Sequence, residues 1–169
     1  SATREPPSPD GSPATTTTER VTNGGFESGA TAWTATSGVI DNSTSTAAHA
    51  GSWKAWLNGY GSAHTDTLMQ AITIPSTAAT AQLTFWLKVS SDETTTTSAY
   101  DTLKVQVRNS SGTVLATLAT YSNLDKGTTW VQRSFDLSAY KGQTVQLNFL
   151  GTEGSTTATS FLVDDVSVK

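Results

Sequence analysis

Two short stretches at opposite ends of the sequence carry carboxylates beside core-sized apolar residues. The first stretch, "VTNGGFESG", places Glu27 directly after Phe26. The second stretch, "FLVDDVSV", places Asp164 on the same inward face as Leu162 and Val166 if the last strand keeps a two-residue period. A carboxylate that points into a core is costly unless it is paired or bound to a cation. Both stretches are therefore candidates for cation chemistry.

The two carboxylates predict a calcium site, provided that the first and last strands are neighbours. Oxygen ligands with flexible geometry select Ca²⁺, at about 2.3–2.6 Å per ligand, and carbonyls of glycine-rich loops complete such sites. The alternative needs no metal: Glu27 caps a turn and Asp164 accepts hydrogen bonds from backbone amides. We expect calcium, because no nearby arginine in the sequence is an obvious partner for Asp164.

A second acidic group lies in the middle of the chain. His64 and Asp66 are two residues apart and so lie on one side of an extended segment, while Glu93 and Asp101 follow in later loops. If the loops at one end of the fold converge, these four residues form a second cation site. The alternative is that they are solvated loop residues.

Outward-facing aromatic residues are the third group of candidates. Trp86 lies opposite the apolar residues of its strand, and Trp56 faces away from the apolar residues of "SWKAWLN". A flat ring matches the C–H face of a pyranose, while polar neighbours bond its hydroxyls. The alternative is that a long loop, such as residues 58–66 or 90–100, covers the indoles as minor core. Two tyrosines complete this set of candidate ligand contacts, Tyr60 and Tyr100.

Catalysis is not expected. Neither His49 nor His64 lies near a recognisable nucleophile motif such as G-x-S-x-G. No spacing among the acidic residues singles out the carboxylate pair that glycoside cleavage needs. The absence of cysteine also excludes disulfides, thiolate catalysis and sulfur-ligated zinc.

Charge and hydropathy exclude two classes of partner. Ten basic and 14 acidic residues give a net charge of −4, and the basic residues are scattered singly, so neither nucleic acid nor anionic lipid is expected to bind. No apolar run approaches the roughly 18 residues of a membrane span.

The elements that must position these residues are strands. Short runs rich in Val, Leu, Ile, Thr, Phe and Trp alternate with Gly/Ser/Asn/Asp clusters, which predicts an all-β, two-sheet antiparallel β-sandwich with jelly-roll topology. A single helical turn is expected at 138–140. The expected strands lie near residue 39 and over 53–57, 68–74, 82–89, 103–107, 114–118, 131–137, 145–149 and 161–168.

The chain divides into a linker and one module. Residues 1–18 hold four of the five prolines and a run of threonines, a composition that predicts a flexible linker. Residues 19–169 are expected to form the β-sandwich module. A Pro/Thr-rich linker before a compact domain is typical of an accessory module tethered to a larger protein.

The motifs "NGGFE", "HAGSWKAWL" and "FLVDDVSV", in this order and spacing, resemble the carbohydrate-binding-module-like β-sandwich superfamily, whose fold is a galactose-binding-domain-like jelly roll. The stretches "AWLNGYGSAHTDTLMQAITIP" and "SAYDTLKVQV" are similar to C-terminal accessory domains of secreted bacterial peptidases of the subtilisin and sedolisin types. The matching segments cover most of residues 20–169. The resemblance implies a structural calcium with these candidate ligands: Glu27, Asp164, Asp165, and the main chains of Asn23, Ser52 and Lys54.

These observations predict a secreted, non-catalytic, calcium-stabilised accessory module, joined in cis to the catalytic domain of a hydrolase. By binding a polysaccharide or an insoluble protein substrate, such a module raises the effective substrate concentration for its neighbour. The alternative is a C-terminal stabilising or folding domain of a secreted serine peptidase, with no ligand of its own. The sequence leaves both roles open.

Overall fold

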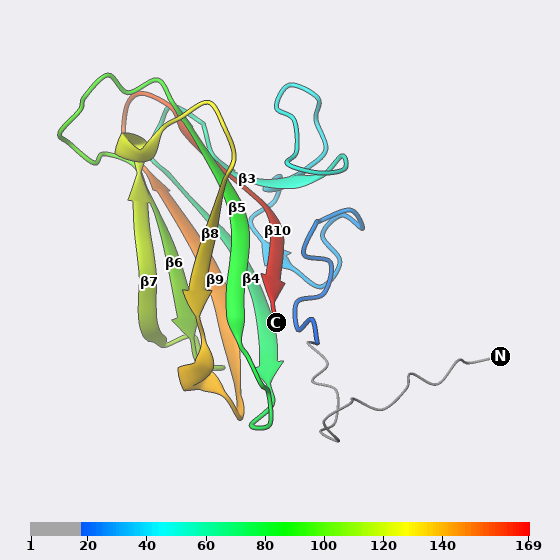
Figure 1. The fold of residues 1–169 in the computed structure, drawn as a ribbon. Coiled ribbons are helices and arrows are strands. Elements are labelled where there is room, and N and C mark those ends of the chain that lie inside the picture. Colours follow the sequence, from blue (N-terminus) through cyan, green and yellow to red (C-terminus); the bar gives the residue numbers. More distant parts are fainter. Residues whose placement is uncertain (1–17) are drawn as a thin grey trace.

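The computed structural model describes residues 18–169, which fold as a sandwich of two five-stranded antiparallel sheets (Figure 1). One sheet has the order β1-β4-β9-β6-β7 and the other has the order β2-β3-β10-β5-β8. The predicted all-β jelly-roll sandwich is confirmed. Except for Thr18, the predicted linker lies outside the described residues. The strands are β1 (Thr34–Ala35), β2 (Ile40–Asp41), β3 (Lys54–Asn58), β4 (His64–Ile74), β5 (Gln82–Ser91), β6 (Thr102–Arg108), β7 (Val114–Ser122), β8 (Val131–Asp136), β9 (Gln143–Glu153) and β10 (Thr159–Val168).

Two short 3₁₀ turns accompany the strands. The turn η2 (Ser138–Tyr140) lies where the sequence predicts it, while η1 (Asn123–Asp125) was not expected. No helix within residues 18–169 has the length and apolar character needed to cross a membrane.

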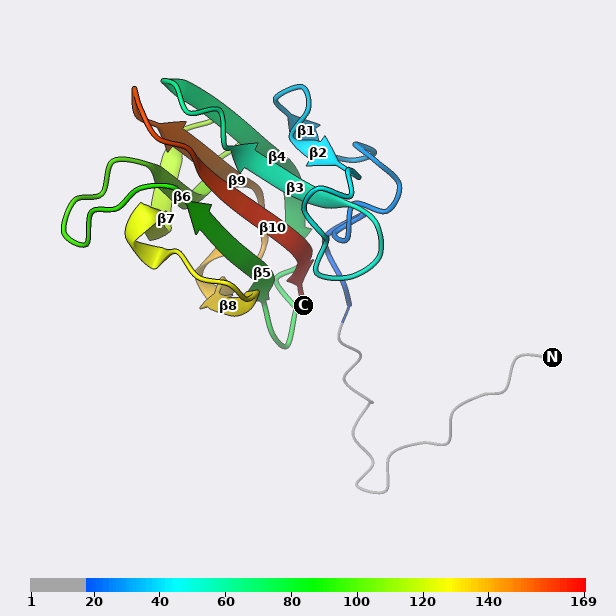
Figure 2. The same cartoon turned by 90° about the horizontal axis from the view of Figure 1, so that it is seen from above.

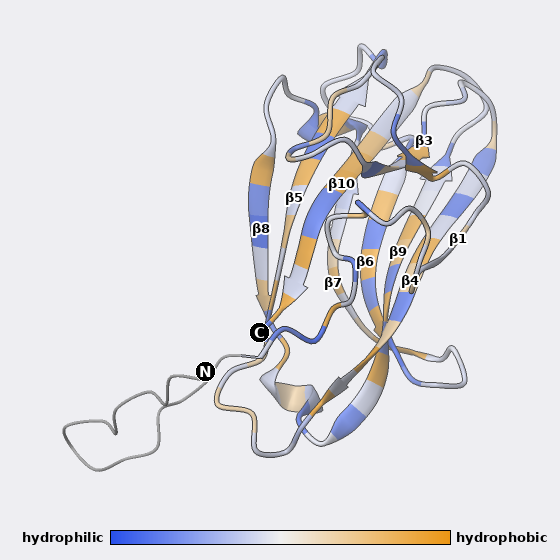
Figure 3. Ribbon diagram, turned by 90° about the vertical axis from the view of Figure 1, so that its right-hand side faces the viewer, coloured by the Kyte–Doolittle hydropathy of each residue, from blue (hydrophilic) through white to orange (hydrophobic). Residues whose placement is uncertain are grey.

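The core lies between the two sheets and follows the two-residue period of the strands (Figure 3). In β5, Leu83, Phe85 and Leu87 are buried and point inward, while the residues between them face outward. Phe85 meets Phe149 of the opposite sheet edge-on, with ring centroids 5.2 Å apart. The alternation in the sequence is therefore a direct consequence of this two-sheet core.

A bulge in β10 reverses the face on which its residues lie. Val163 pairs with the inward Leu87, so the next residue, Asp164, lies on the outer face of the sheet. The register then shifts, with Asp165 at a positive φ of 51°, and Val168 again points inward. The prediction that Asp164 shares the inward face of Val166 and Val168 was wrong, because an extra residue interrupts the period.

The segment before β1 runs against the last strand. Residues 18–33 contain turns and bends but no strand. Arg20 N donates to Val168 O at 2.9 Å, and Val166 N donates to Gly24 O at 2.9 Å. Figure 2 shows the chain entering the fold beside the C-terminal end of β10. The two ends of the module are therefore close, as expected, although the segment that lies beside β10 is not a strand.

Candidate functional site

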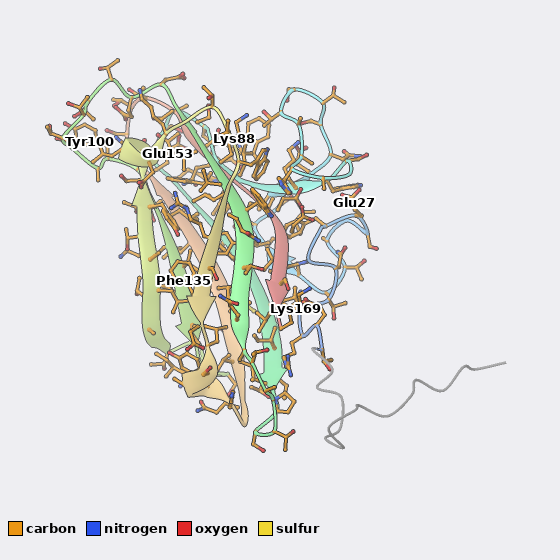
Figure 4. All side chains as sticks on the ribbon, viewed as in Figure 1. Glu27, Lys88, Tyr100, Phe135, Glu153 and Lys169 are labelled. Carbon is orange, nitrogen blue, oxygen red and sulfur yellow. The ribbon has the colours of Figure 1, made fainter. Side chains whose placement is uncertain are left out.

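The loop over residues 42–53, hereafter the covering loop, lies over the outer face of the sheet that contains β10. The carboxylate of Glu27 holds one end of this loop: its Oε1 accepts from Ser52 N and its Oε2 from Trp53 N, both at 2.9 Å. Gly51 has a positive φ of 67°, which favours glycine, and a Cβ there would lie 2.4 Å from Glu27 Oε1 and displace the carboxylate. Glu27 is exposed rather than inward, as Figure 4 shows at the edge of the molecule.

Asp164, on the outer face of β10, binds the same loop from the side of the sheet. Its side chain is fully buried, with Oδ2 accepting from Ala50 N at 3.2 Å and Oδ1 from Asp165 N at 2.8 Å. Burial raises the pKa of Asp164 from 3.8 to about 6, and the adjacent charge of Asp165 adds to this, while the backbone N–H donors oppose it. The carboxylates of Glu27 and Asp164 thus meet the covering loop within four residues of each other.

The remaining predicted calcium ligands make other interactions. The carbonyl of Asn23 already accepts from Phe26 N at 3.0 Å and from Trp33 Nε1 at 2.8 Å, which occupies both of its lone pairs. Asp165 Oδ2 is 2.6 Å from His49 Nδ1. The buried Lys54 ammonium pairs with Asp41 Oδ2 at 2.8 Å. The main chains of Ser52 and Lys54 stay predicted ligands.

The chemistry of Glu27 and Asp164 fits a calcium ion in part. Asp164 is a buried anion with no cationic side chain bonded to it in residues 18–169, and Glu27 binds the same loop. Asn23 does not fit, because its carbonyl is already saturated. Within the described part of the chain, no three His, Asp or Glu side chains surround a common point as metal ligands would. Main-chain oxygens would therefore have to supply most of the coordination.

Beside the covering loop, the outer face of β3, β10 and β5 carries a hollow of about 300 Å³, hereafter the Trp56 hollow. Residues 45–47 of the covering loop form one wall of it. The strands supply the other lining residues, which are Trp56, Lys88, Ser90, Ser160 and Leu162. The hollow combines an indole, an ammonium and several hydroxyls, the side-chain types that bind sugars.

Cross-strand pairing arranges these residues in rows. Leu162 pairs with Trp56 on one side and with Lys88 on the other, so the three form one row across the sheet. Ser160 and Ser90 form the next row. Trp56 Nε1 donates to Ser160 Oγ at 2.9 Å, which fixes the orientation of the indole.

Trp86 lies on the outer face, as predicted, but it does not line the hollow. The ring of His49 stacks on it at 4.1 Å between centroids, and Trp130 meets His49 edge-on at 5.8 Å. The covering loop thus buries much of Trp86, whereas residues 58–66 and 90–100 were the segments suggested for that role. The sequence does not show this, because the contact joins residues far apart in the chain.

The two candidate tyrosines lie elsewhere. Tyr60 and Tyr100 are 51% and 60% exposed, and neither lines the Trp56 hollow. Tyr60 packs on His64 with ring centroids 3.9 Å apart. Figure 4 shows Tyr100 near Glu153, at the end of the sandwich away from β10's C-terminus.

The predicted second acidic group does converge at that end of the sandwich. Asp66 and Asp101 are fully buried and Glu93 is 9% exposed, so these three are not solvated loop residues. Asp66 Oδ1 lies 2.7 Å from His64 Nε2, and Asp66 Oδ2 accepts from Asn58 N at 2.7 Å. A cation at this position stays a prediction.

A fourth buried carboxylate, Glu153, belongs to the same group and was not predicted as part of it. Its two oxygens accept from Tyr60 N, Gly61 N and Thr159 N at 2.9–3.1 Å. Asp101 accepts from Gly154 N at 2.7 Å and from the Thr159 hydroxyl at 2.5 Å. These carboxylates therefore organise the loops through backbone N–H groups.

Burial raises the pKa of Glu93, and the nearby charge of Asp101 adds to the rise, while Lys126 opposes it.

Of the residues that line the Trp56 hollow, the sequence predicted only Trp56 as a ligand contact; the polar strand residues that it missed are Lys88, Ser90 and Ser160. The alternation of β5 places Lys88 on the outer face with Trp86, which is a usable signal. Only the register between strands brings it to the same row as Trp56.

Comparison with solved structures shows the fold. The chain is similar to TmCBM61 in complex with β-1,4-galactotriose, with a TM-score of 0.62 and 15% identity over 90% of this chain and 98% of that one. A family 16 carbohydrate-binding module gives a TM-score of 0.52 and 19% identity, over 88% and 97%. The K3 cleaved adhesin domain of Lys-gingipain from Porphyromonas gingivalis gives 0.58 and 16%, over 89% and 99%.

Carbohydrate-binding modules with a β-sandwich fold are thus among the structural neighbours of the chain. The predicted likeness to that superfamily is confirmed at the level of fold, while the link to subtilisin- and sedolisin-type peptidases stays a prediction. No curated protein matches the chain. A family model matches residues 22–169, which is nearly the whole described module. By that match, the chain belongs to the MAM domain family (meprin/A5/mu).

Proposed function

We propose that this chain is a non-catalytic accessory module of a secreted hydrolase that binds a carbohydrate polymer at the Trp56 hollow. The observation that carries the proposal is the hollow itself, with its oriented indole beside hydroxyl and ammonium groups on one face of a rigid sheet. The fold shared with carbohydrate-binding modules supports it.

The residues that line the hollow would make two kinds of contact with a sugar. The Trp56 ring supplies apolar area for a sugar face, while Ser90, Ser160 and Lys88 supply hydrogen bonds to its hydroxyls. Because the sheet and the covering loop hold these groups in place, little conformational entropy is lost on binding. Tethering to a catalytic neighbour would then raise the local concentration of substrate.

Replacement of the indole tests the proposal. Trp56→Ala should abolish retention of the module on insoluble or gel-embedded polysaccharides that retain the wild type, because the stacking surface is lost. Tyr100→Ala is the matched control, since Tyr100 is an exposed aromatic away from the hollow. Circular dichroism should show both variants folded. If Trp56→Ala binds as the wild type does, or if no polysaccharide in a broad panel retains the wild type, the proposal fails.

We also propose that calcium stabilises the module at Glu27 and Asp164. When bound, the ion would supply positive charge to the buried carboxylate of Asp164 and tie it to the covering loop. The loop in turn forms one wall of the Trp56 hollow, so calcium would act on binding through the position of that wall.

A second candidate role is packing on the parent protein. The edge strand β7 exposes Val114 and Leu115, each 44% exposed and adjacent in the chain. Exposed apolar side chains at a sheet edge suit a protein contact, and in this role the parent catalytic domain would supply it in cis. Deletion of the module would then lower the melting temperature of the parent without changing its adsorption to substrate.

A further inference from the structure

We propose that the Trp56 hollow selects an acidic saccharide, whose anionic group lies against Lys88. This inference rests on the proposed function and narrows it to a substrate class. The shared chemistry is a sugar residue that carries a carboxylate or a sulfate next to a stacking face.

The charge of the lining is the first support. Lys88 is the only ionisable residue that lines the hollow, and no carboxylate lines it. None of the ion pairs within residues 18–169 includes Lys88, and its ammonium makes no hydrogen bond to that part of the chain. The half-buried Lys88 therefore offers its three donors to a ligand.

The spacing of the row is the second support. Trp56 and Lys88 flank Leu162 on neighbouring strands, so their Cα atoms lie about 10 Å apart, at about 4.8 Å per strand. Leu162 itself is buried, so a sugar ring in the hollow between the two outer residues of the row can contact the indole at one side while its exocyclic anionic group points to the ammonium. Charge-assisted hydrogen bonds of this kind are stronger than neutral ones.

The next row supplies the hydroxyl contacts. The Ser160 hydroxyl oxygen accepts from Trp56 Nε1, so its own proton remains available to donate to the ligand. Ser90 lies opposite Ser160 on β5 and makes no hydrogen bond through its side chain within the described residues. Both hydroxyls can therefore bond ring hydroxyls or a second anionic oxygen.

The charges around the hollow limit the attraction of an anionic sugar to direct contact with Lys88. The chain carries a net charge of −4, so a polyanion gains nothing from long-range attraction to the module. Asp164 lies on the same outer face two residues along β10, but it is buried beneath the covering loop. Lys54 lies 5.7 Å from the Trp56 ring and is paired with Asp41, so it adds little free charge.

A matched pair of polymers tests the inference. Polygalacturonate and its fully methyl-esterified form share one backbone and differ in charge, so affinity electrophoresis or calorimetry with both isolates the anionic contact. The wild type should bind the acidic form about tenfold more tightly, the loss expected for one charge-assisted contact. Lys88→Gln should remove that preference, and Lys88→Arg should retain most of it.

Lys104→Gln is the control, because Lys104 is an exposed lysine on β6 in the other sheet. It should leave the preference unchanged, and an equal loss in this variant would overturn the inference. Equal binding of both polymers would also overturn it, yet would leave carbohydrate binding intact. A sulfated galactan serves as a further arm: preference for it over a neutral galactan, lost in Lys88→Gln, would identify sulfate as the anionic group. Retention only by acidic proteins would overturn both this inference and the proposed function.

Discussion

Asp164 is a fully buried carboxylate whose pKa depends on its surroundings. Its pKa is raised from 3.8 to about 6 by burial, so the folded protein binds this proton more tightly than the unfolded chain does. Without metal, protonation of Asp164 therefore favours the folded state. That contribution is fully present below pH about 4 and is lost as the pH rises through about 6.

Calcium should reverse this dependence. Because the ion binds the ionised carboxylate, we expect the rise in melting temperature on adding Ca²⁺ after EDTA to be larger at pH 7.5 than at pH 5. Scanning calorimetry at both pH values measures it. Asp164→Ala should abolish the response, and Asp92→Ala, which changes an exposed carboxylate, should keep it. A melting temperature that ignores calcium at both pH values would refute the proposed site.

Gly24 is a position where an added Cβ atom would not fit. A Cβ there would lie 1.9 Å from the backbone oxygen of Val166, so the entry segment or β10 would have to move. We expect Gly24→Ala to lower the free energy of unfolding by about 1–3 kcal/mol, the usual cost of overpacking.

Gly127→Ala is the matched control, because nothing lies within 4 Å of the added Cβ and its φ is not positive. It should be neutral or stabilise by less than about 1 kcal/mol through the unfolded chain. Urea unfolding of the two variants measures the difference. Equal stabilities would show that the entry segment is not held against β10.

At the scale of elements, the covering loop is the part that links the two sites. Its residues bind Glu27 and Asp164, bury Trp86 under His49, and wall the Trp56 hollow. A substitution at any of these anchoring residues should therefore change the shape of the Trp56 hollow and weaken ligand binding there.

We expect His49→Ala to expose Trp86, because the stacked ring and its bond to Asp165 are both removed. Tryptophan emission should shift to the red and acrylamide quenching should increase. Sugar retention should weaken several-fold as the wall loosens. His64→Ala is the control, since within residues 18–169 that ring packs on Tyr60 and stacks on no tryptophan. Unchanged emission in His49→Ala would contradict the anchoring role.

Most of the strands could be predicted from the sequence, and each error in those predictions has an identifiable cause. The alternation of Leu83, Phe85 and Leu87 predicts β5 because one face of the strand is buried. The same rule misplaced Asp164, since a bulge at Asp165 leaves no mark in the periodicity. Local rules could find strands and outward rings, but not insertions that shift their phase.

At the scale of the whole molecule, long-range contacts determine which candidate residues come together, and this grouping could not be predicted from the sequence. That Glu27 and Asp164 serve one loop, and that Trp56 and Lys88 flank one residue, both depend on strand order. The buried group around Glu153 is similar, because its members come from separate strands and loops of both sheets. Candidate residues were predictable by type, whereas their grouping required the fold.

The closeness of the entry segment to the end of β10 has a mechanical consequence. Antiparallel neighbours pulled from the same end separate like a zipper, with one hydrogen bond loaded at a time. Tension between Thr18 and Lys169 would thus break the bond from Arg20 N to Val168 O before the one from Val166 N to Gly24 O. The seam between the entry segment and β10 would therefore open from its outer end inward, and the bonds between Lys169 and Gln82 of β5 would carry the same load.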